Sequence, residues 1–310
     1  MRILFMGTPD FALPTLQALQ ESGDEVVGVV TQPDKPKGRG HILTPPPVKV
    51  YAMQEGLPVY QPQTLKNGAF DDTLQALDPE LIVVVAYGKI LPASLLNYPK
   101  YGCINVHGSL LPLLRGAAPM QRAIIDGHEV TGVTTMYMAE GLDTGDMLLR
   151  REMTIEQDDN FETVHDKLAS LGAAAMTDTV KALKDGTLLR IPQDDSLATY
   201  AQKIEKSDCL LDFSQTAQSL HNRIRGLSPM PLAFTHTPDG KMLKILSAKP
   251  TDKTGVLAPA GTVLSVDGGI EVACGEGSLL ISRVTPEGKG QMPAADFVRG
   301  RKVSVGDVLQ

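Results

Sequence analysis

The chain has 310 residues, of which 42% are hydrophobic and 21% charged, and its formal net charge is −7. This length favours two domains, and the composition is that of an ordered globular protein. The acidic balance argues against a generic nucleic-acid binder, which carries a basic surface. From Asp208 onward, however, 11 Lys and Arg residues nearly balance 10 Asp and Glu residues. Any RNA contact must therefore use local basic loops or one face.

The N-terminal sequence and the cysteines indicate the cellular compartment of the protein. The N-terminus shows no signal-peptide pattern, and no apolar run approaches the roughly 18 residues that a membrane helix needs. Three scattered cysteines form no metal-binding pattern: Cys103, Cys209 and Cys274. We therefore expect a cytoplasmic protein, a monomer, with no metal and no membrane partner.

The first part of the chain predicts a parallel, doubly wound sheet. Apolar strands are expected at 2–6 and 26–31, with a helix at 11–20 between them, which makes a β-α-β unit. The turn at Gly7 lacks the G-x-G-x-x-G pattern, which argues against NAD binding. Residues 81–86 are the most apolar run and predict a central strand.

A long loop is predicted at 32–47, rich in proline, glycine and basic side chains. A structureless loop of this length in a compact domain is usually functional or disordered. Both a solvated surface excursion and a lid that contacts phosphates fit its composition. Its basic residues are Lys35, Lys37, Arg39 and His41.

A short apolar strand is predicted to begin at Cys103, and it contains two polar side chains. Asn105 and His107 are two positions apart, so they face the same side of an extended chain. At the carboxyl end of a strand in a parallel sheet, a carboxamide and an imidazole can polarise a carbonyl and move a proton. The alternatives are a turn cap at Asn105 and a satisfied core histidine at His107.

An acidic motif lies further along the chain. Asp143 stands between two glycines in Gly141-Leu-Asp-Thr-Gly-Asp146, a pattern that suits a tight turn presenting a carboxylate. Spacing alone does not prove that Asp143 meets His107. Cys103 shares the strand parity of His107, so a cysteine nucleophile is an alternative, but a small buried filler is the favoured interpretation.

The second half changes character towards its end. Strands at 132–138 and 148–155 would form a hairpin around the Asp143 loop, and helical spacing predicts a helix at 161–184. Residues 188–207 lack periodicity and predict a linker. After a helix at 217–225, short strands separated by glycine turns suggest a small barrel.

Several motifs together resemble the signature of the folate-dependent formyltransferases. These are Asn105-Val-His107-Gly-Ser-Leu-Leu-Pro112, Arg115-Gly-Ala-Ala-Pro119 and Gly141-Leu-Asp-Thr-Gly-Asp146. Two further segments narrow the resemblance to the members of this family that act on aminoacylated tRNA. These are Gly7-Thr-Pro-Asp-Phe11 and Thr31-Gln-Pro-Asp-Lys-Pro-Lys-Gly-Arg-Gly40. It covers nearly the whole chain, and the motifs are specific only in combination.

The resemblance implies an α/β fold in which a doubly wound, mostly parallel Rossmann-like sheet precedes a small C-terminal OB-like β-barrel. We expect a catalytic domain at 1–187, a linker at 188–207 and a tRNA-binding domain at 208–310. Near Ser228-Pro-Met-Pro231 the chain departs from the family pattern, where a tryptophan usually sits between the prolines. We expect Met230 to fill the same apolar slot.

The implied reaction transfers the formyl group of 10-formyltetrahydrofolate, a co-substrate, to the α-amine of methionine on initiator methionyl-tRNA. Asn105 would donate a hydrogen bond to the formyl oxygen. His107 would stabilise the oxyanion and help protonate the leaving folate nitrogen, while Asp143 would orient His107. The expected folate-pocket residues are Ile90, Leu91, Ser109, Leu110, Leu111 and Pro112. The expected tRNA contacts are Arg39, Lys35 and Lys37.

Three other functions fit parts of the sequence. A formyltransferase acting on a small amine, such as a sugar nucleotide or glycinamide ribonucleotide, would share Asn105, His107 and Asp143 but would not need the basic loop or the barrel. A hydrolase that releases formate from the same folate would leave the barrel unexplained. A non-catalytic RNA-binding module would leave the Asn-x-His motif unexplained.

Overall fold

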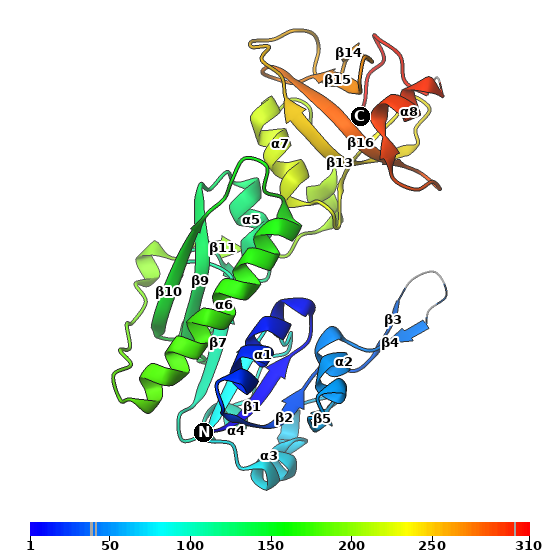
Figure 1. Cartoon of the computed structure of the whole chain (residues 1–310). Coiled ribbons are helices and arrows are strands. Elements are labelled where there is room, and N and C mark those ends of the chain that lie inside the picture. The colour runs from blue at the N-terminus through cyan, green and yellow to red at the C-terminus, as the bar shows by residue number, and fades with distance from the viewer. Residues whose placement is uncertain (38–39, 41, 301) are drawn as a thin grey trace. The chain divides into compact units, whose positions relative to one another are not determined.

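The computed structural model describes residues 1–310 except 38, 39, 41 and 301 (Figure 1). The described chain divides into two compact units. Unit 1 comprises Met1–Gly116, Thr131–Met153 and His165–Tyr200; unit 2 comprises Ala117–Val130, Thr154–Val164 and Ala201–Gln310. Two short segments from the middle of the chain, 117–130 and 154–164, therefore belong to the same unit as the C-terminal residues.

A seven-stranded sheet forms the centre of unit 1, in the order β10-β9-β7-β6-β1-β2-β5. The strands are β1 (Arg2–Gly7), β2 (Glu25–Val30), β5 (Val59–Tyr60), β6 (Leu81–Val85), β7 (Cys103–His107), β9 (Val130–Tyr137) and β10 (Met147–Thr154). Neighbours from β5 to β7 pair in parallel, and β9 runs antiparallel to β7. Taken in chain order, the five parallel strands lie as 3-2-1-4-5, which confirms the predicted doubly wound, Rossmann-like sheet.

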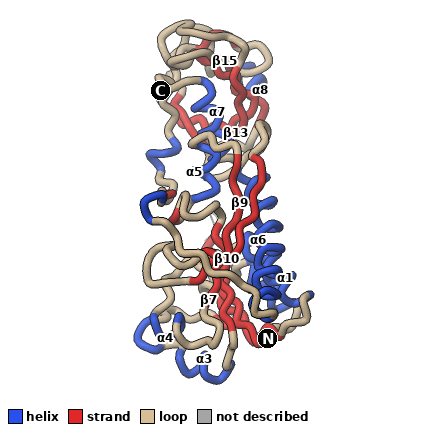
Figure 2. Tube along the Cα trace, turned by 90° about the vertical axis from the view of Figure 1, so that its left-hand side faces the viewer, coloured by secondary structure: helices blue, strands red, loops and turns tan. Residues whose placement is uncertain are grey.

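Both faces of this sheet are covered, which is why its central strands are apolar throughout. The helices of unit 1 are α1 (Leu13–Glu21), α2 (Pro47–Gln54), α3 (Asp71–Leu77), α4 (Ala93–Leu96) and α6 (Phe161–Lys184), the last beginning in unit 2. Helices α1 and α6 lie on the same side of the sheet (Figure 2). Shorter helical turns are η1 (Asp10–Ala12), η2 (Lys66–Gly68) and η3 (Asp195–Leu197).

The two faces of β7 contact different helices. A side chain at Gly172 of α6 would come within 2.8 Å of Val106, so this helix packs closely on the Val106 face. Cys103 instead belongs to an apolar cluster with Leu74 of α3 and Leu95 of α4. The positions that share parity with Cys103 therefore face away from α6.

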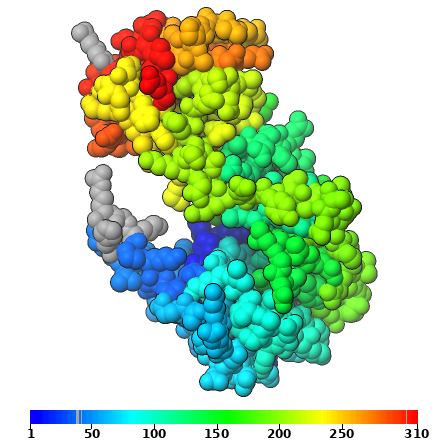
Figure 3. Space-filling model, turned by 180° about the vertical axis from the view of Figure 1, so that it is seen from behind, coloured from blue at the N-terminus to red at the C-terminus, as the bar shows by residue number. Residues whose placement is uncertain are grey.

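The predicted basic loop contains a hairpin, because β3 (Lys35–Lys37) pairs antiparallel with β4 (Ile42–Thr44). The hairpin stands out from the surface of unit 1, in the blue part of the chain (Figure 3). At its base, the carboxylate of Asp34 accepts hydrogen bonds of 2.8 Å from Lys49 and Gln61. These bonds tie the residue before β3 to α2 and to Gln61, just after β5.

Unit 2 contains a curled antiparallel sheet in the order β12-β13-β16-β15-β14, with β17 beside β16. The strands are β12 (Ala233–His236), β13 (Met242–Pro250), β14 (Val263–Ser265), β15 (Ile270–Ala273), β16 (Ser278–Pro286) and β17 (Met292–Pro293). The helices are α5 (Pro119–Ile125), η4 (Lys206–Cys209), α7 (Ala217–Gly226) and α8 (Ala294–Arg299). Outside the sheet of unit 2, β8 (Arg115–Gly116, in unit 1) and β11 (Tyr200–Ala201) form a separate two-stranded pair.

The last residues of the chain bridge the two edges of this curled sheet. On one edge, the backbone N–H of His236 in β12 donates to the carbonyl of Gln310. On the other edge, the N–H of Leu309 donates to the carbonyl of Gly261, just before β14. Only glycine fits at 261, where φ is 86° and a Cβ would lie 2.5 Å from the Leu309 carbonyl. The closure agrees with the predicted barrel.

The prediction for Met230 is wrong, because its side chain is 70% exposed. The residue lies in a turn between two prolines, and Leu232 is the buried side chain of this segment.

Among the described residues, no helix is both long enough and apolar enough to cross a membrane.

Candidate active site

The candidate site lies where β7 ends. Asn105 is half-buried and His107 is 6% exposed, both on the face that turns away from α6. Within the described residues, no side-chain hydrogen bond engages the Asn105 carboxamide. Its N–H groups are therefore available to a ligand, which a turn cap would not allow.

A backbone carbonyl fixes the state of the imidazole. Nε2 of His107 lies 3.1 Å from the carbonyl oxygen of Leu114. A carbonyl can only accept a hydrogen bond, so Nε2 carries a proton and donates it to Leu114. The other ring nitrogen, Nδ1, then faces Oδ2 of Asp143 at 3.7 Å. This separation is that of an ion pair rather than a direct hydrogen bond.

The loop after β7 also holds the carboxylate. The backbone N–H of Gly116 donates to Oδ2 of Asp143 over 2.8 Å. Leu114 and Gly116, two residues apart, therefore anchor His107 and Asp143 respectively. Neither anchor was predicted, because both act through backbone atoms and no side-chain pattern in the sequence marks them.

The two glycines around Asp143 do not have equal roles. A Cβ at Gly145 would lie 1.8 Å from the carbonyl oxygen of Tyr137, so only glycine allows this close approach. At Gly141 the nearest atoms belong to the flexible Thr144 side chain. Asp143 itself has φ of 51°, a left-handed conformation that Asp and Asn tolerate better than other side chains.

The structure brings Asn105, His107 and Asp143 towards one edge of the sheet. This edge of the sheet therefore carries an amide donor, an imidazole with a fixed N–H, and a carboxylate that faces the imidazole. Such a set can stabilise negative charge on an oxygen and transfer a proton. Cys103 is unsuited to nucleophilic attack, because it is buried and burial raises the pKa of its thiol to about 12.

The six residues predicted for the folate pocket divide by exposure. Ile90 is 91% exposed, whereas Leu91, Ser109 and Leu111 are almost wholly buried. The Ser109 hydroxyl donates to the carbonyl of Leu113 over 2.6 Å, so this side chain already has a structural partner. Leu110 and Pro112 are partly exposed.

The predicted tRNA contacts lie on the hairpin. Lys35, at the start of β3, is exposed. Lys37 lies in the same strand, and its side chain falls outside the described part of the structure. Arg39 is one of the residues that the structure does not describe.

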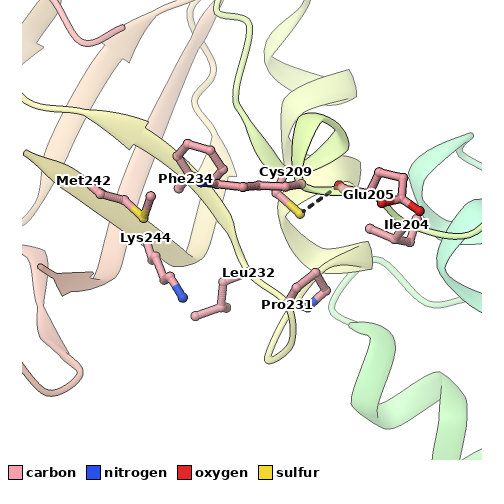
Figure 4. Close-up of a pocket in the computed structure, with 9 residues that line it drawn as sticks. Ile204, Glu205, Cys209, Pro231, Leu232, Phe234, Met242 and Lys244 are labelled. Atoms are coloured by element: carbon pink, nitrogen blue, oxygen red, sulfur yellow. Dashed lines mark hydrogen bonds between the residues drawn. The ribbon is translucent and has the colours of Figure 1, made fainter. Parts of the chain in front are cut away.

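Unit 2 has a separate cavity of about 340 Å³ (Figure 4). Its walls are mainly apolar and come from η4, β12 and β13 with the neighbouring turns. The lining residues are Ile204, Glu205, Lys206, Cys209, Pro231, Leu232, Phe234, Met242 and Lys244. None of the predicted site residues lines this cavity. In the described residues, no group of three or more His, Cys, Asp or Glu side chains could hold a metal ion.

Comparison with known proteins identifies the family. A formyl transferase model matches residues 1–180, and a formyl transferase C-terminal domain model matches residues 203–302. The chain belongs to the formyltransferase family. It is therefore a transferase, as the sequence motifs predicted.

Relatives of this formyltransferase match it from end to end. The methionyl-tRNA formyltransferase of Geotalea uraniireducens is 49% identical over 309 residues, which cover 100% of this chain and 98% of that one. That of Citrifermentans bemidjiense is 50% identical over 310 residues, covering 100% and 96%.

A solved structure shows the same fold at much lower identity. WlaRD, a sugar 3N-formyl transferase studied in the presence of dTDP and 5-N-formyl-THF, superposes with a TM-score of 0.67 at 16% identity. The match covers 94% of this formyltransferase and 99% of WlaRD. At this identity the likeness concerns the fold alone.

Proposed function

We propose that the enzyme transfers the formyl group of 10-formyltetrahydrofolate to the α-amino group of methionine on initiator methionyl-tRNA. The product, N-formylmethionyl-tRNA, serves translation initiation. The observation that carries this choice of acceptor is the identity of 49–50%, over the full length, to relatives named methionyl-tRNA formyltransferases.

In the proposed reaction, the neutral amine nitrogen attacks the formyl carbon and gives a tetrahedral oxyanion. The C–N bond to N10 of the folate then breaks, the amine loses one proton, and N10 gains one. The oxyanion needs hydrogen-bond donors placed before the reaction begins. Asn105 supplies an amide N–H, supported by its half-buried carboxamide, which takes part in no hydrogen bond within the described residues.

In the proposed reaction, His107 and Asp143 transfer the protons and stabilise the charges that form. Because Nε2 keeps its proton on the Leu114 carbonyl, the Nδ1–H of the doubly protonated ring is the group that stabilises the oxyanion and passes to the leaving nitrogen. Asp143 holds the ring in the correct orientation and balances its positive charge, supported by the 3.7 Å separation of Nδ1 and Oδ2. Asp143 also accepts the proton of the amine, directly or through water.

The substrates occupy separate parts of the molecule in this proposal. Folate lies against Ile90, Leu91 and the segment Ser109–Pro112, with the exposed Ile90 and the partly exposed Leu110 and Pro112 in direct contact. The hairpin reaches the tRNA through Lys35, Lys37 and Arg39. Residues 1–187 form the catalytic domain, 188–207 the linker and 208–310 a tRNA-binding domain, and the enzyme acts as a cytoplasmic monomer.

Acceptor competition tests the proposed substrate against a small amine. The purified enzyme is given 10-formyltetrahydrofolate with either methionyl-tRNA or an amino-sugar nucleotide, and the release of tetrahydrofolate and the formylated product are both followed. We expect product only with methionyl-tRNA. Formylation of the sugar alone would make the enzyme a small-amine transferase, and tetrahydrofolate release without any formylated amine would make it a hydrolase.

A further inference from the structure

Residues 190–199, within the predicted linker, form a strap across two loops of the candidate site in unit 1. Ile191 and Met147 exchange backbone hydrogen bonds of 2.8 and 2.9 Å, which ties the strap to the end of the Asp143 loop. The N–H of Arg115 donates to the carbonyl of Thr199, and the N–H of Leu114 donates to the Thr199 hydroxyl. The strap is therefore fixed to both loops by its backbone and by the Thr199 hydroxyl.

A buried arginine joins the strap to the loop after β7. The side chain of Arg115 is only 1% exposed. Its Nε and Nη2 atoms donate to Oε1 of Gln193 over 3.0 and 2.8 Å, and Nη2 also donates to Asp195 over 2.7 Å. A buried guanidinium is costly unless its donors are used, so this pairing accounts for a charge in the interior.

The other half of the Gln193 carboxamide contacts the candidate catalytic loop. Nε2 donates to the carbonyl oxygens of Asp143 and Gly145, over 2.8 and 2.7 Å. The orientation of this amide has no ambiguity, since guanidinium offers only donors and backbone carbonyls only acceptors. Gln193 therefore uses both of its polar atoms to connect Arg115 with the backbone on either side of Thr144.

A salt bridge adds a second link between the strap and the same loop. Nη2 of Arg190 lies 2.9 Å from Oδ2 of Asp146, and its guanidinium lies over the ring of Tyr137. Arg190 is exposed and Asp146 is half-buried, so this pair contributes little by itself. The part-buried hydrogen bonds of Gln193, to the buried Arg115 and to two backbone carbonyls, are the stronger constraint.

We propose that Gln193 is a positioning residue for formyl transfer, acting by holding the backbone of the Asp143 loop so that the carboxylate faces His107. This inference rests on the proposed function. The left-handed backbone at Asp143 needs such support, because its φ of 51° is a sparsely populated conformation. Without the two donors of Gln193, the Asp143 carboxylate shifts away from Gly116 and His107.

The substitution Gln193→Glu separates the two contacts of this residue. Glutamate still accepts from Arg115, but it has no N–H and its second oxygen repels the carbonyls of Asp143 and Gly145. We expect kcat to fall about 10–100-fold, as for a small misplacement of a reacting group, with KM for folate and tRNA within about twofold. Asp195→Ala is the matched control, since it removes a partner of Arg115 that does not touch the loop, and its kcat should stay within about twofold of wild type.

A double substitution tests whether Gln193 acts through Asp143. In an Asp143→Asn background, Gln193→Glu should reduce kcat by no more than about threefold further, because residues that act as a unit are non-additive. Full multiplication of the two losses would overturn the proposal. Equal losses in Gln193→Glu and Asp195→Ala would also overturn it, since they would assign the effect to the burial of Arg115.

Hydrogen exchange gives a readout that does not depend on activity. The amide of Gly116 is protected by the Asp143 carboxylate, so we expect its exchange to accelerate at least about tenfold in Gln193→Glu and to stay unchanged in Asp195→Ala. Unchanged exchange in Gln193→Glu, or in Gln193→Leu if the first variant does not fold, would overturn the proposal. A wild-type enzyme that fails to formylate methionyl-tRNA would refute the proposed function, while the exchange of Gly116 would still decide the role of Gln193.

Discussion

Nδ1 of His107 and Oδ2 of Asp143 lie 3.7 Å apart, and one loop sets this separation. The carbonyl of Leu114 accepts from His107, and the N–H of Gly116 donates to Asp143. Because the two anchors belong to the same short stretch of backbone, the imidazole and the carboxylate keep their relative positions. The pair depends on backbone geometry as much as on its own side chains.

Asp143→Asn tests the charge of this pair. Asparagine keeps an oxygen for the Gly116 N–H and tolerates the left-handed backbone, so the fold should be retained. Only the negative charge that faces His107 is lost. We expect kcat to fall at least about 100-fold, the scale of losing one electrostatic element of an active site. Steady-state formylation and thermal unfolding measure the two effects, and near-normal turnover would contradict the role given to Asp143.

Asn105→Ala tests the amide donor. In the described part of the structure this side chain takes part in no internal hydrogen bond, so its removal should change the free energy of unfolding by less than about 1 kcal/mol. Loss of one oxyanion donor should lower kcat by about 100–1,000-fold. Single-turnover rates with bound folate and tRNA isolate the chemical step. A variant that is slow only because KM has risen would show that Asn105 binds substrate instead.

Two neighbouring apolar residues should respond differently to truncation. Ile90 is 91% exposed, so Ile90→Ala should leave stability within about 0.5 kcal/mol and raise KM for 10-formyltetrahydrofolate several-fold. Leu91 is 4% exposed, and Leu91→Ala should cost about 2–5 kcal/mol of stability. Urea unfolding and folate titration of both variants make the comparison. Equal KM values for Ile90→Ala and wild type would remove Ile90 from the folate site.

Asp24 should make unit 1 sensitive to acid. Burial raises the pKa of this carboxyl, but hydrogen bonds from Lys184, the α-amino group of Met1 and Ser22 outweigh burial and lower the pKa below 3.8. The fold therefore stabilises the charged form. This stability is fully present above pH 3.8 and is lost as the pH falls through the lower, folded-state value.

Asp24→Asn provides the measurement for that prediction. At pH 7 it should lower the free energy of unfolding by about 1.5–3 kcal/mol, because hydrogen bonds to a charged group are lost. Below the unfolded-state pKa the difference from wild type should shrink. Asp72→Asn, at an exposed position in α3, is the control in the same unit. A deficit for Asp24→Asn that stays constant from pH 7 to pH 3 would contradict the account.

Local patterns predicted much of the fold because they reflect burial and helix endings. The predicted helix at 161–184 has the bounds of α6, since apolar residues recur at helical spacing and Gly186 follows with φ of 69°. The strand that begins at Cys103 was predicted from its apolar residues, and the two-residue period of a strand placed Asn105 and His107 on one face. The hairpin within 32–47 was not predicted, because the sequence Lys-Pro-Lys lacks the alternation of a strand.

The parts of the site that were not predicted from the sequence share one physical feature: their sequence carries no distinguishing pattern. Leu114 and Gly116 contribute a carbonyl and an N–H, and every residue has these groups, so nothing in the sequence marks them. Gln193 lies in a stretch without periodicity, and its contacts join residues about 50 and 78 positions away. Met230 was assigned to an apolar slot by analogy, although the turn around it leaves the side chain exposed.

The most direct test of the central claim compares initiator and elongator methionyl-tRNA as acceptors. Purified enzyme is mixed with 10-formyltetrahydrofolate and each tRNA in turn, and formylmethionine is quantified after release from the tRNA. The account predicts rapid formylation of the initiator and much slower formylation of the elongator, with no formylated product for Asn105→Ala on the same time scale. Failure to formylate either tRNA while the folate donor is consumed would contradict it.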